Sequence, residues 1–251
     1  MFKFKKKPKK IKYGSKNILK ALETWKYLII QEEKKKNEYP YFGLKCYYGG
    51  QGKGKTLSAV REVIYKLKKY PRTILITNVD IKDIKNKTYK FSTPEELMEL
   101  LDKIVNTEST DGVIVLADEI QVLFSEMFRE GYNENLLMWL AQMRKSHLEI
   151  IGTTQQFSKL PRLIRDYILQ NGQLVYCNKL KFTRIIQVNK YLDMDTTTTD
   201  SNNNLRPETM CYEWFFHTKE LYECYDTRAI ISTITSSLKK KRNINYENIY
   251  D

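Results

Sequence analysis

The sequence Gly49-Gly50-Gln51-Gly52-Lys53-Gly54-Lys55-Thr56 follows an apolar stretch at 44–48 and precedes an amphipathic stretch at 57–69. It matches the pattern GxxxxGK(S/T) in full, between a predicted strand and a predicted helix, which is the context that separates a phosphate-binding loop from a chance glycine-rich turn. Glycines let consecutive backbone N–H groups converge on phosphate oxygens. The helix that begins near Lys55 adds the positive end of its dipole. Residues 49–56 therefore predict a nucleotide-binding loop.

The last two residues of this loop suit ATP and Mg²⁺. The Lys55 ammonium can reach the β- and γ-phosphates, and the Thr56 hydroxyl can bind Mg²⁺. We therefore expect ATP and Mg²⁺ as cofactors, with Lys55 both a phosphate ligand and a catalytic residue.

A second motif, Asp118-Glu119, ends an apolar stretch at 113–117 that is typical of a strand in the centre of a parallel sheet. One carboxylate there can hold Mg²⁺, directly or through water, and its neighbour can polarise the attacking water. We expect Asp118 to hold the metal together with Thr56, and Glu119 to act on water. Ligands of open α/β sheets lie at the carboxyl ends of strands, where the two motifs would meet. An ordinary acidic strand end is the alternative.

A third motif is Gly-Thr-Thr-Gln-Gln at 152–156, at the end of a predicted strand. An amide that emerges beside the phosphate site can contact the γ-phosphate or the attacking water, so Gln155 is a further candidate catalytic residue. The alternative is that Thr154 and Gln155 only begin a turn.

From residue 41 onward, predicted strands alternate with predicted helices, the pattern of βαβ units and a parallel sheet. Thr93 as N-cap, Pro94 in the first position and Glu96 closing a capping box mark one strong helix start. The chain therefore predicts an α/β fold, a P-loop NTPase with a mainly parallel central sheet flanked by helices. The predicted strands lie at 44–48, 73–77, 113–117, 148–152 and 173–177, and the predicted helices at 57–69, from 94 onward, at 134–146 and at 160–168.

The region after residue 177 predicts the edge of the sheet. Residues 181–188 can pair with the preceding strand as a hairpin, and 212–217 and 221–225 are interpreted as antiparallel edge strands. Residues 195–204 are polar without an apolar anchor, which predicts a loop.

The net charge of +13 comes almost entirely from the two ends of the 251-residue chain. Residues 1–36 contain 13 basic and 3 acidic side chains, and residues 239–251 contain 4 basic and 2 acidic ones, so the segment between them is nearly neutral. Flexible polycations favour the binding of any polyanion, chiefly through counterion release. DNA, RNA, anionic lipid and an acidic protein surface all fit that description, and so does a solvated tail without a partner.

These patterns divide the chain into four segments. Residues 1–14 are a basic flexible arm, and 15–40 are an amphipathic helix that Ser15 can cap. Residues 41–235 are the P-loop ATPase domain, and 236–251 are a basic C-terminal tail. The apolar stripe of the N-terminal helix is expected to pack on the main domain, with binding to a membrane surface as the alternative.

Several kinds of protein and site are excluded. The four cysteines stand singly beside only two histidines, so no zinc-ligand spacing can be assembled. No apolar run approaches the ~20 residues that a membrane span needs, and no signal peptide is visible. The Asn-Lys-x-Asp sequence that guanine specificity usually requires is missing. We expect a cytoplasmic protein.

Together these motifs resemble the additional-strand P-loop ATPases of the FtsK–HerA superfamily, over roughly residues 43–230. Within it they are most similar to viral genome-packaging ATPases and to zonula occludens toxin-like phage assembly proteins. That branch places a strand between the two motif-bearing strands, which residues 73–77 could supply. The residues that carry the resemblance are Gly49 to Thr56, Ile76-Thr77-Asn78, Asp118-Glu119-Ile120-Gln121, Arg144-Lys145-Ser146-His147, Thr154-Gln155 and Arg165.

The resemblance implies an oligomeric ring, a hexamer or a pentamer, with ATP sites between subunits and DNA passing through the centre. An arginine from one subunit would then reach the γ-phosphate of its neighbour. Arg144 is the first candidate for that role, with Arg165 and Arg162 behind it, and a solvated helix-end charge is the alternative for each. The resemblance also implies docking on a capsid vertex, a portal or another virion component. A membrane fits less well, because no apolar span follows in 205–251.

Three functions fit these observations. The first is an ATP-driven DNA translocase that packages a viral or phage genome. The second is a zonula occludens toxin-like ATPase for phage morphogenesis or export at a membrane. The third is an assembly or adaptor module that binds ATP without turnover.

Overall fold

The computed structural model describes the chain in two compact units, residues 1–38 and 39–251. In the first unit, residues 22–26 are helical, as the predicted helix at 15–40 requires. The rest of that unit, including the predicted arm at 1–14, and the predicted tail at 236–251 lie outside the described residues. The described residues are 22–26, 39–107, 110–131, 133–180, 185–199 and 205–225.

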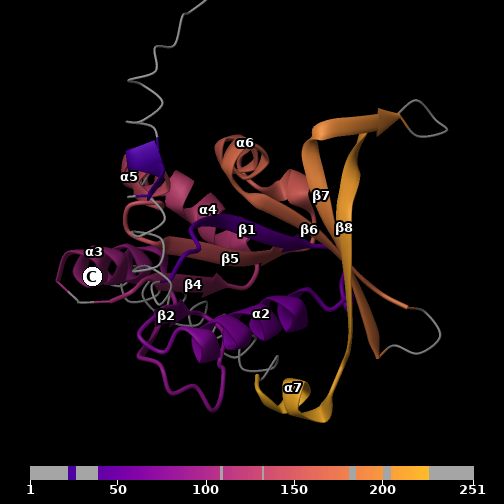
Figure 1. The fold of residues 1–251 in the computed structure, drawn as a ribbon, viewed down its shortest axis with the longest axis horizontal. Helices are drawn as coiled ribbons and strands as arrows, with labels where there is room; N and C mark the ends of the chain where they lie inside the picture. The colour runs from indigo at the N-terminus through magenta and orange to yellow at the C-terminus, as the bar shows by residue number, and fades with distance from the viewer. Residues whose placement is uncertain are drawn as a thin grey trace, which may run out of the picture. The chain divides into compact units, whose positions relative to one another are not determined.

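The described part of the second unit contains an eight-stranded sheet with the strand order β3-β2-β4-β5-β1-β6-β7-β8 (Figure 1). The strands from β3 to β6 in that order are parallel, and β7 and β8 are antiparallel at one edge. This confirms the predicted fold class. The strands are β1 (Gly43–Tyr48), β2 (Ile74–Thr77), β3 (Thr88–Lys90), β4 (Val113–Ala117), β5 (Leu148–Thr154), β6 (Gln173–Lys179), β7 (Ile186–Thr199) and β8 (Leu205–Phe216).

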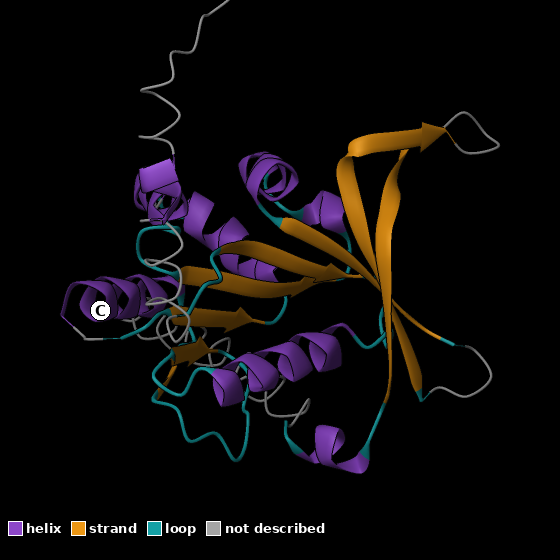
Figure 2. Cartoon of the chain, in the orientation of Figure 1, coloured by secondary structure: helices purple, strands orange, loops and turns teal. Residues whose placement is uncertain are grey.

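Helices cover both faces of the sheet (Figures 1 and 2). One face packs against α2 and α7, and the other packs against α3, α4, α5 and α6. All five residues of β4 are buried, because this central strand is covered from both sides. The helices are α2 (Lys55–Lys69), α3 (Pro94–Thr107), α4 (Ile120–Arg129), α5 (Asn133–Gln142), α6 (Arg162–Asn171) and α7 (Lys219–Glu223), with a 3₁₀ turn η1 (Phe157–Lys159).

The predicted capping box at the start of α3 is confirmed. The Ser92 N–H donates to Glu96 Oε2 at 2.7 Å, and the Glu96 N–H donates to Thr93 Oγ1 at 3.3 Å. These contacts satisfy backbone donors that the first helical turn leaves without an intrahelical partner.

The strand order corrects one expectation about the sheet. Residues 73–77 were expected to supply the strand between the two motif-bearing strands, β1 and β4, but β2 lies on the far side of β4. The strand between them is β5, which pairs in parallel with both. The order of strands along the chain does not fix their order in space, because each crossover helix can return the chain on either side.

Two predictions about the C-terminal half were wrong in part. Residues 195–199, predicted to begin a polar loop, continue β7 as a strand. Residues 221–225, predicted as an edge strand, lie mostly in α7, whose N-cap Thr218 accepts from the Leu221 N–H at 3.3 Å. The short edge strand β3 and helix α4 were not predicted at all.

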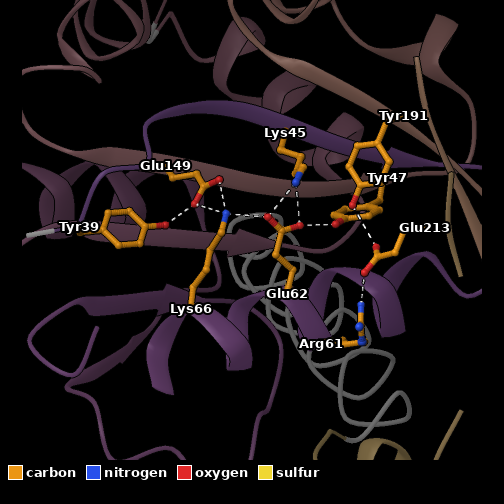
Figure 3. Close-up of polar contacts among 9 residues, drawn as sticks. All are labelled: Tyr39, Lys45, Tyr47, Arg61, Glu62, Lys66, Glu149, Tyr191 and Glu213. Atoms are coloured by element: carbon orange, nitrogen blue, oxygen red, sulfur yellow. Dashed lines mark hydrogen bonds and ion pairs between the residues drawn. The ribbon is translucent and has the colours of Figure 1, made fainter. Parts of the chain in front are cut away.

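Helix α2 is fixed to the sheet by a buried cluster of charges (Figure 3). Lys66 Nζ lies 2.6 Å from Glu149 Oε1 of β5 and 2.6 Å from Glu62 Oε1, one turn earlier on the same helix. Glu62 also accepts from Lys45 Nζ of β1 at 2.8 Å. Because α2 begins directly at the predicted phosphate-binding loop, these pairs set the position of the loop relative to β1 and β5.

The protonation of Glu62 follows from this arrangement. Burial acts to raise the pKa of the Glu62 carboxyl, but Lys45 and Lys66 outweigh it and lower the pKa to about 2. The Tyr47 hydroxyl donates to the same carboxylate. Glu62 is therefore ionised throughout the physiological range and stabilises the folded chain in that form.

Glu62→Gln should lower the free energy of unfolding at pH 7 by about 3 kcal/mol, because it leaves the Lys45 ammonium without its carboxylate and Lys66 with Glu149 alone. The folded pKa lies below the unfolded value of about 4.3. The stabilisation is thus complete above that value and is lost as the pH falls towards 2. Urea denaturation at several pH values should show the difference from wild type shrinking below about pH 4.5.

Arg61→Gln is the matched control, because it breaks a half-exposed pair of the same helix with Glu213. Such pairs are screened by solvent, so its cost should stay under about 1 kcal/mol. An equal loss of stability in both variants would contradict a special role for the buried cluster.

Candidate nucleotide-binding site

The loop between β1 and α2 needs glycine at its two ends. Gly49 has φ 150°, and a Cβ there would lie 2.8 Å from Cys177 O. Gly54 has φ 82°, in the left-handed region, and a Cβ there would lie 2.1 Å from Gln187 Oε1. The close approach of β6 and β7 therefore leaves no room for side chains at these positions.

Of the first two side chains of α2, Lys55 crosses the loop and Thr56 faces the end of β4. Lys55 is buried, and its Nζ donates to Gly50 O across the loop at 3.2 Å. The Thr56 hydroxyl donates to Asp118 Oδ1 at 2.9 Å. The structure therefore brings together the two residues predicted to hold Mg²⁺, although they are 62 positions apart in the sequence.

The donor set fits Mg²⁺. A hydroxyl oxygen and a carboxylate oxygen lie side by side at the end of the phosphate-binding loop. Mg²⁺ usually takes one or two carboxylates together with substrate phosphate oxygens and water. Thr56 and Asp118 would hold the ion there, and the bound ion would neutralise charge on the phosphates.

Asp118 is fixed through both its side chain and its backbone. Its Oδ1 also accepts from the Thr153 hydroxyl of β5. Asn78, just after β2, accepts from the Asp118 N–H at 2.8 Å and donates to Asp118 O at 3.2 Å. Burial raises the pKa of the Asp118 carboxyl, although the hydrogen bonds from Thr153 and Thr56 act to lower it.

Glu119 lies in a left-handed conformation, with φ 53°, directly before α4. That conformation is uncommon for a residue other than glycine, and it turns the chain sharply from β4 into the helix. The Glu119 N–H donates to Thr153 Oγ1 at 3.2 Å, and its carboxylate accepts from Gln155 Nε2 at 3.1 Å. Gln121 Nε2 donates to the other carboxylate oxygen. Two amides therefore orient the carboxylate beside the predicted metal ligands.

The candidate arginines are not part of this cluster. Arg144 is exposed in the turn before β5, at the amino end of that strand, whereas the cluster lies at the carboxyl ends. Arg162, on α6, is exposed, and its Nε lies 3.6 Å from Asp166 Oδ2 on the same helix. Arg165, also on α6, is half-buried, and its Nε has no hydrogen-bond partner among the described residues.

Sequence reasoning assigned no role to Asn78, Thr153 or Gln121, which hold Asp118 and Glu119 in place. A signal for Asn78 and Thr153 was present, because both lie at the carboxyl ends of strands that flank β4. Polar side chains at those ends converge in a parallel sheet. Gln121 was part of the Asp118-Glu119-Ile120-Gln121 motif, but its contact with Glu119 could not be anticipated because α4 was not predicted.

Comparison with solved structures finds distant likenesses. The N-terminal domain of zonular occludens toxin from Neisseria meningitidis is 17% identical, with a TM-score of 0.49, over 74% of this chain and 100% of that one. The flagellar accessory protein FlaH from Methanocaldococcus jannaschii is 12% identical, with a TM-score of 0.42, over 67% and 90%. A KaiC-like protein from Pyrococcus horikoshii is 14% identical, with a TM-score of 0.43, over 68% and 84%. At these values we draw nothing from them about activity.

Family membership rests on the sequence itself. No match was found among curated proteins. The sequence model of the family described as Zonular occludens toxin (Zot) matches residues 44–206, well over half of the chain. The match spans the phosphate-binding loop, Asp118-Glu119 and Gln155, and it confirms the resemblance to zonula occludens toxin-like proteins. The chain therefore belongs to the Zot family of phage-associated P-loop ATPases.

Proposed function

We propose that this chain hydrolyses ATP with Mg²⁺ and couples the hydrolysis to the movement of DNA during phage assembly. The observation that carries the proposal is the meeting of three sequence motifs at one edge of the sheet. Thr56 contacts Asp118, and Gln155 contacts Glu119, across the adjacent strands β1, β5 and β4. These contacts support a site in which a phosphate loop, a metal ligand and a base act side by side.

Each residue has a distinct role in the proposed reaction. Lys55 and the backbone N–H groups of residues 49–56 bind the phosphates. Glu119 polarises the water that attacks the γ-phosphorus, and Gln155 orients Glu119 and that water. The bond from the water oxygen to the γ-phosphorus forms as the bond to the bridging β–γ oxygen breaks. ADP and inorganic phosphate are the products.

Membership of the Zot family favours phage morphogenesis or export over packaging into a preformed particle. Packaging remains the second candidate, because the same site and the same basic tails serve either task. The charge of the chain, concentrated in residues 1–36 and 239–251, supports DNA as the polyanion that is recruited. The proposed partners are DNA, further copies of the chain in a ring, and a virion component.

In the part of the chain that the structure describes, no helix combines the length and the apolar character needed to cross a bilayer.

Steady-state ATP turnover, measured with and without single- or double-stranded DNA, tests the proposal. Wild-type protein should hydrolyse ATP faster with DNA. Lys55→Ala should lose both nucleotide binding and turnover, because it removes the main phosphate cation. Glu119→Gln should still bind ATP but turn it over about 10²–10⁴-fold more slowly, the range for loss of a general base.

Glu130→Gln, at the exposed end of the helix that follows Glu119, is the matched control and should retain wild-type turnover. Nucleotide-dependent assembly of the wild-type chain with no turnover would contradict the proposal in favour of a module that only binds ATP. Turnover indifferent to both forms of DNA would contradict the coupling alone.

Gln155→Ala should lower kcat for ATP roughly tenfold to a hundredfold with little change in KM, because the amide acts on the carboxylate and the water rather than on the bound phosphates. Gln156→Ala, the exposed next residue, should behave as wild type. An unchanged kcat in Gln155→Ala would mean that this residue only begins a turn after β5.

Complementation between inactive subunits tests whether an arginine acts on the site of a neighbour. Arg144→Ala and Lys55→Ala proteins should each be inactive alone, yet regain part of the activity when mixed, because each supplies what the other lacks at a shared interface. Arg165→Ala is run in parallel. Recovery with Arg165→Ala alone would replace the first candidate by the second, and no recovery with either would contradict action in trans by these arginines.

A further inference from the structure

A residue of the β7–β8 hairpin forms a hydrogen bond with the backbone of the phosphate-binding loop. Gln187 of β7 is fully buried, and its Nε2 donates to Lys53 O, a main-chain carbonyl within the loop, at 3.0 Å. The Gln187 side chain also fills the space beside Gly54, where a Cβ would lie 2.1 Å from Gln187 Oε1. The hairpin therefore touches the loop at the residue before α2.

The orientation of the Gln187 amide follows from its partners. A main-chain carbonyl can only accept, so the amide nitrogen must face Lys53 O. The same nitrogen lies 3.1 Å from Asn189 Oδ1, two residues further along β7. The amide oxygen faces His217 Nε2 at 3.1 Å, so this ring nitrogen must carry the hydrogen.

His217 is fixed from its other side as well. Its Nδ1 lies 2.5 Å from the hydroxyl of Tyr222 on α7, which donates to it. Burial and the nearby Lys179 ammonium lower the pKa of His217 to about 4, so the ring is neutral at physiological pH. A neutral ring with its hydrogen on Nε2 satisfies both contacts. The chain of hydrogen bonds from Tyr222 to Lys53 O therefore has a donor and an acceptor at every step.

Two further contacts fix the peptide groups around Gly54. The side chain of Lys53 is fixed as well, because its Nζ donates to Asn178 Oδ1 of β6 at 3.0 Å. Gly54 O accepts from the Ser58 N–H at 3.0 Å, the first hydrogen bond of α2. Lys53 O and Gly54 O, the carbonyl oxygens before and after the Gly54 Cα, therefore both accept hydrogen bonds from the protein.

In a trans peptide the C=O and N–H groups point in opposite directions. When Gln187 holds Lys53 O toward β7, the N–H of Gly54 in the same peptide unit faces away from β7, into the loop. This N–H is one of the backbone donors that such a loop directs at phosphate. We infer that Gln187 is a positioning residue for nucleotide binding, which sets the direction of the Gly54 N–H before the nucleotide arrives.

The inference rests on the proposed function only in that the loop binds a nucleotide; it requires neither hydrolysis nor DNA. A donor that contacts phosphate equally in the ground state and the transition state contributes uniform binding. Its loss raises Kd and KM while kcat changes little. A residue that only stabilised the fold would lower the melting temperature without altering nucleotide affinity.

Gln187→Glu is the selective variant, because a carboxylate keeps the length of the side chain and can accept from His217 but cannot donate to Lys53 O. Titration with a fluorescent ATP analogue and Mg²⁺ at pH 8 should give a Kd raised by about tenfold or more. Gln187→Met removes the donor without adding charge and should raise Kd by about tenfold. His217→Phe leaves the donor but frees its orientation, and should raise Kd by about threefold.

Val188→Ala is the control, since this half-buried neighbour on β7 faces the other side of the strand; its Kd should stay within about twofold of wild type. The rise in melting temperature on adding nucleotide is measured for every variant, so that destabilisation is separated from lost affinity. That rise should shrink in the Gln187 variants and persist in Val188→Ala. Wild-type Kd in the Gln187 and His217 variants would overturn the inference, whereas failure of wild-type protein to bind ATP would contradict the proposed function instead.

Discussion

The buried pairing of Lys66 with Glu149 and Glu62 is the interaction on which the position of the site depends. It joins α2 to β5, and Lys45 extends it to β1. Charges removed from water must be matched closely by opposite charges, or their desolvation destabilises the fold by several kcal/mol. The cluster therefore restricts the helix to one placement on the sheet. Thr56, at the start of that helix, then meets Asp118 at the end of β4 at hydrogen-bond distance, and Lys55 beside it reaches back to Gly50 O of the loop.

Much of the fold follows from local sequence. The uninterrupted apolar residues of β4 and the capping box at Thr93 to Glu96 each specify one conformation through side-chain chemistry alone. The order of strands could not be predicted, because an apolar strand carries no mark that identifies its neighbours. The sequence of α4 does carry a helical pattern, since Ile120, Leu123, Phe124 and Met127 recur at helical spacing and are buried.

The errors at the C-terminal edge have physical causes. Threonines at 196–199 favour an extended backbone because they are β-branched, and residues 197–199 pair with β8. The apolar and aromatic residues at 221–225 favour a strand, but the cap at Thr218 stabilises a helical turn instead. For the site, the motifs identified Lys55, Thr56, Asp118, Glu119 and Gln155 as neighbours. Gln187 had no such signal, because its role arises from a long-range contact between a hairpin and a backbone carbonyl.

The pairing of β1 has a consequence for how the protein is made. This strand carries the phosphate-binding loop at its end, yet its partners in the sheet are β5 and β6, at residues 148–179. A ribosome must therefore extend the chain by about a hundred residues after β1 before either partner strand exists, and contacts so distant in sequence form slowly. During that interval the glycine-rich loop has no frame that could direct its N–H groups at phosphate. The loop therefore gains the frame of its neighbouring strands only after residues 148–179 have been synthesised, and nucleotide that binds the framed loop stabilises the folded chain over the unfolded one.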